Sequence, residues 1–157
     1  MTEATLEATT TAPGWRRAWA VIAGKLESLV SHNLIALAAR FGLGGVFFYS
    51  ARTKVTGLLT VNENAYTLFE EEYKLPLISP ELGAHLAAYA EHLFPLLLAL
   101  GLATRLSALG LLAMTAVIQI FVYPAAWPTH LTWAAALLYL AGRGGGALSL
   151  DRLLAIR

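Results

Sequence analysis

Three ionisable side chains lie inside apolar stretches of this sequence and are its first candidates for chemistry: Arg40, Lys54 and Glu91. A charged residue at the centre of a membrane-spanning helix costs about 2.5–3.5 kcal/mol on insertion scales, so it usually faces a partner, a cavity or a functional site. A carboxylate such as Glu91 can relay a proton or accept a hydrogen bond from a ligand. The sequence therefore predicts a small membrane protein with a polar interior.

Helical spacing predicts which polar residues meet. Lys54 follows Arg40 by 14 positions, which brings both side chains close to one helix face. Thr115, Gln119 and Tyr123 recur at every fourth position and form a polar stripe. We expect an outward-facing ligand pocket formed by Lys54, Glu91, Gln119, Tyr123 and His130. We expect a second, structural polar cluster at the cytoplasmic face, formed by Arg40, Arg105 and Asp151.

The sequence leaves two interpretations of Glu91 open. The carboxylate is either half of a structural ion pair, with Lys54 or Arg40 as its partner, or a functional group of the pocket. Two other pocket residues also have purely structural interpretations. His130 lies at the start of a helix, and Gln119 can form a hydrogen bond between helices.

Histidines raise two further, less favoured interpretations. His85 and His130 are the pair best matched in depth as axial ligands of a haem, and Glu91, His92 and His130 are the candidate ligands of a metal ion. We favour neither haem nor metal and expect no covalent cofactor, whereas a quinone is a candidate ligand. The chain has no cysteine, which excludes a redox disulfide and a cysteine-ligated cluster.

Long apolar helices must position these residues. Of the 157 residues, 57% are hydrophobic and only 13% are charged, against about 25% charged in a soluble domain. The net charge of +1 gives no support for nucleic-acid binding. The pattern predicts an all-α fold, an integral membrane four-helix bundle. Its spans are predicted at residues 33–57, 81–103, 105–123 and from 128 to just before 142, with Ser79 and Pro80 starting the second and a short helix at residues 149–157.

The N-terminal region, residues 1–32, is predicted to be separate from the membrane domain at residues 33–157. Residues 1–14 are rich in Thr, Ala and Glu and are predicted to be disordered. Trp15, Trp19, Ile22, Leu26 and Leu29 then lie on one helix face, which predicts an amphipathic helix on the membrane surface. The alternative is an ordinary helix packed on the bundle.

Charges in the loops predict the orientation. Basic residues cluster before the first span, in the turn at Arg105 and in the C-terminal tail, whereas the loop at residues 58–79 is rich in glutamate. The positive-inside rule then places both termini in the cytoplasm of a bacterial inner membrane. Residues 62–73 are predicted to form a short amphipathic helix in the outward loop.

The chain resembles the DoxX family of small four-helix bacterial membrane proteins over residues 34–154. The resemblance rests on Arg40 with the glycines at 42–45, Lys54, Glu91, residues 101–105, His130 and residues 144–151, with Gly145 where the family usually has proline. Residues 69–76 and 119–124 resemble a subgroup often encoded beside genes for peptide-derived metal-binding products.

The resemblance implies the function class. Relatives are described as subunits of quinone-linked oxidoreductases, including thiosulfate oxidation, and as membrane anchors of redox-defence complexes. We therefore expect a small inner-membrane subunit of a redox or stress-response system that binds a quinone-type lipid, an accessory subunit rather than an enzyme alone. The partners expected are membrane lipid and either another protein or a second copy of the chain. The alternatives are a non-redox membrane partner or transport component for a metal-binding peptide or metal, and a structural anchor for soluble partners.

Overall fold

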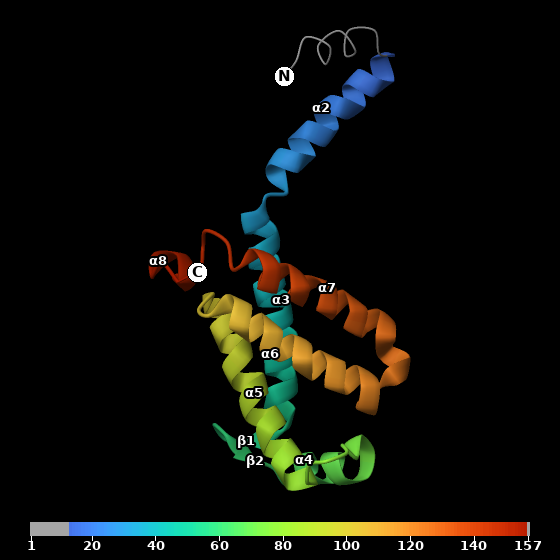
Figure 1. Ribbon diagram of the computed structural model, residues 1–157, viewed down its shortest axis with the longest axis vertical. Coiled ribbons are helices and arrows are strands. Elements are labelled where there is room, and N and C mark those ends of the chain that lie inside the picture. The colour runs from blue at the N-terminus through green and yellow to red at the C-terminus, as the bar shows by residue number, and fades with distance from the viewer. Residues whose placement is uncertain (1–12, 157) are drawn as a thin grey trace.

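The computed structural model describes residues 13–156. The predicted disorder of residues 1–14 lies almost wholly outside this range, and so does the basic residue Arg157. The described chain consists of helices joined by short connections and one small β-hairpin (Figure 1).

Four long helices form the helical body of the protein. They are α3 (His32–Thr53), α5 (Pro80–Leu100), α6 (Thr104–Val117) and α7 (Trp127–Arg143). α3 packs on α5 and α6 packs on α7, while α5 also contacts α6 and α3 contacts α7, so each helix has two neighbours. The largest fully buried apolar side chains come from all four helices and are Phe47, Leu98, Leu111, Leu137 and Leu140.

Local signals in the sequence explain where several helices begin. The Ser79 side chain accepts a hydrogen bond from the backbone N–H of Leu82, and Pro80 occupies the first turn of α5, as predicted. Ser149 caps the short helix α8 (Leu150–Leu153) in the same way. α5 ends at Gly101, whose φ of +68° is a left-handed conformation that glycine adopts without strain.

The end of α3 corrects one predicted boundary. The helix stops at Thr53 rather than at residue 57, and the chain turns through an antiparallel hairpin of β1 (Val55–Thr56) and β2 (Thr60–Val61). The four paired residues are all β-branched and favour strand, and Gly57 has the positive φ that the turn requires. We call this end of the helical body, with α4 (Glu63–Thr67) and the π-helical segment η1 (Leu68–Tyr73), the hairpin end, and the opposite end the terminal end.

Two π-helical segments face each other at the hairpin end. The predicted helix at residues 62–73 begins at the Asn62 cap as α4 and continues as η1. The predicted span 105–123 is also not regular throughout, because α6 ends at Val117 and continues as the π-helix η2 (Ile118–Val122), followed by the 3₁₀ turn η3 (Pro124–Ala126). η1 contacts η2. π-Helical segments are rare and often mark functional sites.

The N-terminal helix α2 (Gly14–Leu29) has no buried residue and extends away from the helical body (Figure 1). The helix predicted around Trp15–Leu29 is therefore present. The alternative in which it packs on the four helices is not what the structure has. Its apolar face remains exposed, with Trp15 at 71% and Leu29 at 69%.

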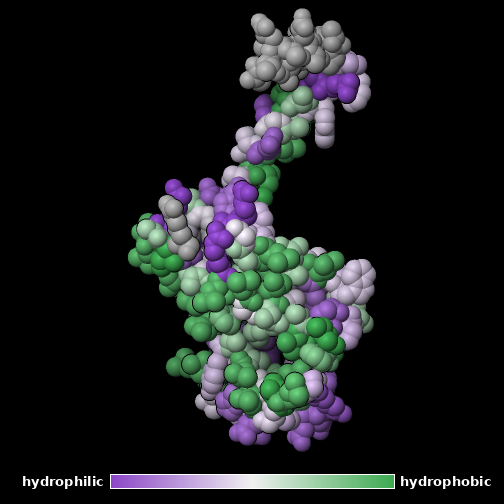
Figure 2. All heavy atoms as spheres, viewed as in Figure 1, coloured by the Kyte–Doolittle hydropathy of each residue, from purple (hydrophilic) through white to green (hydrophobic). Residues whose placement is uncertain are grey.

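The outer surface of the helical body is apolar. Figure 2 shows hydrophobic residues over the middle of the face in view and hydrophilic residues gathered at the hairpin end. Two segments of the described chain, His32–Thr53 and Thr104–Val122, are long and apolar enough to cross a membrane, and a third or less of the residues in their most apolar stretches is buried. Four spans were predicted. The other two predicted spans are less apolar or shorter. α7 has only 17 residues, and the apolar sequence of α5, although the helix is continuous, is interrupted by His85, Glu91 and His92.

Candidate functional site

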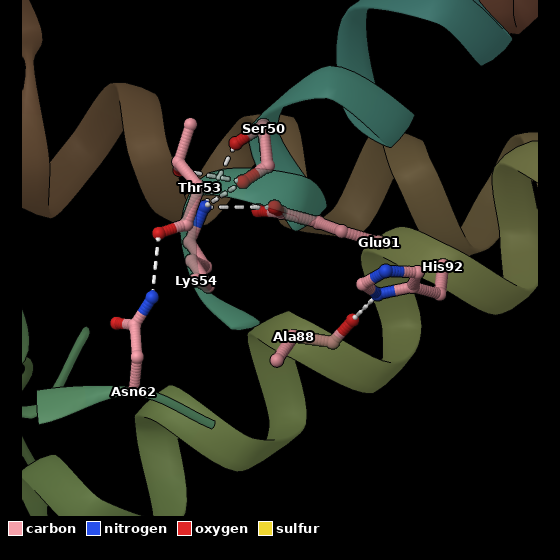
Figure 3. A network of polar contacts seen from close by, with 7 residues as sticks. All are labelled: Ser50, Thr53, Lys54, Asn62, Ala88, Glu91 and His92. Carbon is pink, nitrogen blue, oxygen red and sulfur yellow. Dashed lines mark hydrogen bonds and ion pairs between the residues drawn. The ribbon is translucent and has the colours of Figure 1, made fainter. Parts of the chain in front are cut away.

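A buried ion pair links α3 to α5. The Nζ of Lys54 lies 2.8 Å from the Oε2 of Glu91, and both residues are 3% exposed. The same ammonium donates to the hydroxyl of Ser50 at 2.8 Å and to its carbonyl at 3.2 Å (Figure 3). The three donors of the ammonium therefore all have acceptors. Of the two partners the sequence allowed for Glu91, the structure pairs it with Lys54.

The second carboxylate oxygen of Glu91 is left for other uses. Within residues 13–156 no hydrogen bond reaches its Oε1, and Glu91 lines a cavity of about 410 Å³. A carboxylate oxygen accepts hydrogen bonds only, unless it is protonated. The cavity therefore has an acceptor in its wall.

The cavity owes its place to the divergence of α5 and α6. These helices meet at the turn after Leu100 and separate toward the hairpin end (Figure 1). The lining comes from the N-terminal half of α5, the C-terminal half of α6 with η2, and facing residues of α3 and α7. Phe69 and Tyr73 of η1 add to it from the loop. Most of the lining is apolar, and Ser50, Tyr73, Glu91, Tyr123 and His130 are its polar members.

Hydrogen bonds define the tautomer of His130. The Gln119 side chain donates from Nε2 to the carbonyl of Pro124 at 2.9 Å, so its Oε1 faces the Nδ1 of His130 at 2.7 Å. Because an amide oxygen only accepts, Nδ1 carries the proton and Nε2 of the neutral ring is an acceptor. Gln119 thus acts on the cavity through His130 and does not line it, although both border a smaller hollow of about 300 Å³.

Two tyrosines stand where η1 meets the end of η2. Burial raises the pKa of Tyr73 well above its usual value, and its ring meets that of Tyr123 edge-on at 5.8 Å between centroids. The hydroxyl of Tyr123 donates to the Glu72 carboxylate, which is the main reason that the pKa of Tyr123 is raised. Both phenols therefore stay protonated at neutral pH, and the proton of Tyr123 is already donated to Glu72.

Of the predicted pocket residues, Glu91, Tyr123 and His130 line the cavity. Lys54 and Gln119 do not line it. Lys54 binds the lining residue Glu91, and Gln119 binds the lining residue His130. Sequence reasoning missed Ser50 and Tyr73. Ser50 lies one helical turn before Lys54, which was a usable signal. The position of Tyr73 depends on how the loop folds over the helices, and no local pattern indicates that.

The second predicted cluster, Arg40, Arg105 and Asp151, lies at the terminal end, but these residues bind backbone rather than one another. The buried Arg40 guanidinium donates to four carbonyls, those of Leu98, Ala99, Gly145 and Leu148, at 2.6–3.0 Å. Asp151 accepts from the N–H groups of Ala103 at 2.6 Å and Thr104 at 2.8 Å. Arg105 donates to the carbonyls of Ala141 and Gly142. Helix ends leave such backbone groups without partners, which explains what the three side chains do.

The two remaining candidate histidines, His85 and His92, occupy separate surroundings. His85 lies beside Tyr66 and Tyr89, whereas His92 uses Nδ1 to bond the Ala88 carbonyl at 2.6 Å and has no partner for its buried Nε2. In the part of the chain that the structure describes, no three histidine, aspartate or glutamate residues come together as metal ligands.

Comparison with known proteins gives a family. Residues 35–124 match the family model of DoxX, a range that includes Lys54, Glu91 and Tyr123. A protein of Haemophilus influenzae, described as uncharacterized, is 30% identical over 135 residues, which cover 80% of this chain and 86% of that protein. No solved structure matches.

Proposed function

Because the chain belongs to the DoxX family of small membrane proteins, we propose that it is an accessory subunit of a redox or stress-response system and that its cavity binds a quinone-type lipid. The observation that carries the proposal is a largely apolar cavity of about 410 Å³ with the free oxygen of Glu91 in its wall. Ligand pockets of this size combine apolar lining with a few polar groups that orient the ligand.

The proposal includes four membrane crossings, by α3, α5, α6 and α7. Leucines exposed along α5, such as Leu93, Leu96 and Leu100, would face lipid. With 17 residues, α7 is about 25 Å long, short for a hydrocarbon core of ~30 Å, and η3 precedes it with one more turn. The cavity would then lie between helices within the membrane.

Hydrogen-bond polarity favours the reduced ligand. A quinol carries two O–H donors, whereas a quinone carries two carbonyl acceptors. Glu91 on α5 offers an acceptor to the cavity, and so does Nε2 of His130 on α7 in the neutral form of its ring. The quinol therefore has an acceptor for each hydroxyl, one of them the Glu91 carboxylate, while a quinone meets neutral donors such as the hydroxyls of Ser50 and Tyr73.

Trp133 provides a probe of binding because it lines the cavity. We expect decyl-quinol and decyl-quinone to quench its fluorescence saturably in the detergent-solubilised protein, with tighter binding of the quinol. Trp133→Phe should remove most of the quenching. A thiol reductant can keep the ligand reduced, since the chain has no cysteine to react with it. Absence of saturable quenching by either form would refute the proposal.

Glu91→Gln tests the polarity argument. The Lys54 ammonium only donates, so in this variant it would bind the oxygen of the new side-chain amide and turn the NH₂ group toward the cavity. The preference should then shift from quinol toward quinone. Glu81→Gln is the matched control, since Glu81 is an exposed residue of the same helix and lies outside the cavity. Equal changes in both variants would contradict the role of Glu91.

The binding role does not extend to electron transfer by this chain alone. It has no cysteine for a disulfide or a cysteine-ligated cluster. We therefore expect the purified protein neither to reduce nor to oxidise a soluble quinone, with a partner supplying the electrons. Steady turnover by the isolated chain that disappears in Glu91→Gln would make it an enzyme.

The proposed orientation places both termini in the cytoplasm of a bacterial inner membrane. In support, Arg105, Arg143 and Arg152 lie at the terminal end, whereas Glu70, Glu71 and Glu72 lie at the hairpin end. A reporter enzyme that is active only outside the cytoplasm should be inactive when fused after the C-terminus and active when inserted within residues 62–74. The reverse pattern would overturn the orientation.

A further inference from the structure

A second cavity, separate from the ligand cavity, opens at the terminal end. It measures about 830 Å³ and lies where the start of α6, the end of α7 and the short helix α8 meet. Three arginines line it, one from each of these helices: Arg105, Arg143 and Arg152. Among the residues that the structure describes, Asp151 is the only carboxylate in its lining.

Both oxygens of the Asp151 carboxylate already have hydrogen-bond donors. Both of its oxygens accept backbone N–H groups at the start of α6, from Ala103 and Thr104. Over residues 13–156, no ion pair forms between a carboxylate and any of the three arginines. The cavity therefore has an excess of positive charge that the described chain does not neutralise.

Arg105 is held in place with part of its donor capacity unused. Its Nη1 donates to the carbonyls of Ala141 and Gly142, at 2.8 and 2.7 Å. Its Nε and Nη2 lie near Gly144, 3.9 and 3.8 Å from the position that a side chain there would take. Two adjacent N–H donors on a fixed guanidinium suit the oxygens of a phosphate group.

Apolar side chains border the same cavity. Leu106 and Ile156 are part of its lining and are 66% and 49% exposed. Leu153 and Leu154 beside them are also exposed. Basic side chains next to exposed leucines are the pattern of a surface at the boundary between headgroups and acyl chains.

We propose that this cavity binds the phosphate headgroup of an anionic phospholipid, with Arg105, Arg143 and Arg152 as its cationic ligands. The exposed leucines would lie against the acyl chains. A free phosphate ion shares the headgroup chemistry but would make no use of the apolar border.

Native mass spectrometry of the detergent-solubilised full chain tests the site. The protein should hold one phosphatidylglycerol more tightly than one phosphatidylcholine, because both have a phosphodiester but only the first has a net charge. Arg143→Gln combined with Arg152→Gln should weaken phosphatidylglycerol binding roughly 25-fold, at about fivefold for each basic residue near an anionic headgroup. Arg105 is left intact because it also supports the end of α7.

The matched control removes two positive charges at the hairpin end, with Arg52→Gln and Lys74→Gln. It should leave phosphatidylglycerol binding unchanged. Equal losses in the two double variants would show attraction to overall charge and would overturn the site, as would equal binding of the two lipids by the unmodified protein. Displacement of phosphatidylglycerol by millimolar inorganic phosphate would overturn the assignment to lipid and indicate a phosphate-ion site.

Discussion

Two buried cations, Arg40 within α3 and Lys54 at the C-terminal cap of α3, have opposite kinds of partners. Arg40 is bound by four backbone carbonyls at the terminal end, whereas Lys54 is bound by a carboxylate and a serine near the hairpin end. The acceptors of Arg40 are all backbone carbonyls. The Arg40 site therefore joins α5 to the α7–α8 connection and presents no free acceptor to a ligand. The Glu91 carboxylate has a second oxygen, and the Lys54 site therefore keeps binding capacity directed at a cavity.

The chain is packed more closely around Arg40 than around Lys54. At Gly101, an added side-chain carbon would lie 2.7 Å from the guanidinium of Arg40 and 2.6 Å from Ser149. Near Lys54 and Glu91, the helices diverge and leave a hollow of about 410 Å³. A charge enclosed by close-packed backbone serves stability, and a charge pair beside a hollow has room for a ligand.

The largest effect is expected from Arg40→Ala. Four carbonyls of α5 and the α7–α8 connection would lose a charged donor, and hydrogen bonds to charged groups contribute about 1.5–3 kcal/mol each. Because bonds made by one side chain are not additive, we expect less than their sum, a loss of about 4–6 kcal/mol in the free energy of unfolding, measured by denaturation in detergent. Arg40→Lys should recover only part of it, because an ammonium cannot match the planar fork. A loss below about 1 kcal/mol would mean that the carbonyls find other donors.

Glu91→Ala should come next, at about 3–5 kcal/mol, because it leaves a buried cation without its counter-charge. Lys54→Ala combined with Glu91→Ala should be more stable than the sum of the single losses, since neither charge is then stranded. The test is the coupling free energy from this double-mutant cycle. Strict additivity would contradict a direct pair, and the Arg40 site offers no equivalent cycle because its partners are backbone.

Gly101→Ala should be destabilising by about 1–3 kcal/mol from its left-handed φ alone. Overlap with Arg40 and Ser149 adds to this cost. Thermal unfolding of the variant measures it. An unchanged melting temperature would show that the terminal end is less closely packed than the Arg40 contacts indicate.

Gly83→Ala should have the smallest effect, below about 1 kcal/mol. The added carbon would lie 2.7 Å from the ring of Phe69, but that ring borders the cavity and can move into it. The same variant should weaken quenching of Trp133 by the quinol, since it takes up cavity space. A cost as large as that of Gly101→Ala would mean that the Phe69 side of the cavity is rigid.

Much of the secondary structure could be predicted from local residue patterns. The Ser79–Pro80 start of α5, the Asn62 cap of α4 and the Ser149 cap of α8 are all interactions within a few residues. The hairpin after Thr53 was missed because the apolar helix pattern continues without a break into Val55 and Thr56. The only local signal of the hairpin is the turn at Gly57, which separates these two β-branched residues from Thr60 and Val61. The π-helical segments were missed because their residue types do not differ from those of an α-helix.

The sequence by itself determined the membrane character, the family and the placement of Arg40 and Lys54 on one helix face, since these depend on composition, motifs and a period of 3.6 residues. Only the tertiary structure decided that Glu91 binds Lys54, and that Arg40 binds carbonyls from two distant segments. Carbonyl groups are the same in every residue, so no residue type announces them as partners. The cavity likewise follows from the divergence of α5 and α6, which depends on how all four helices pack and not on any one segment.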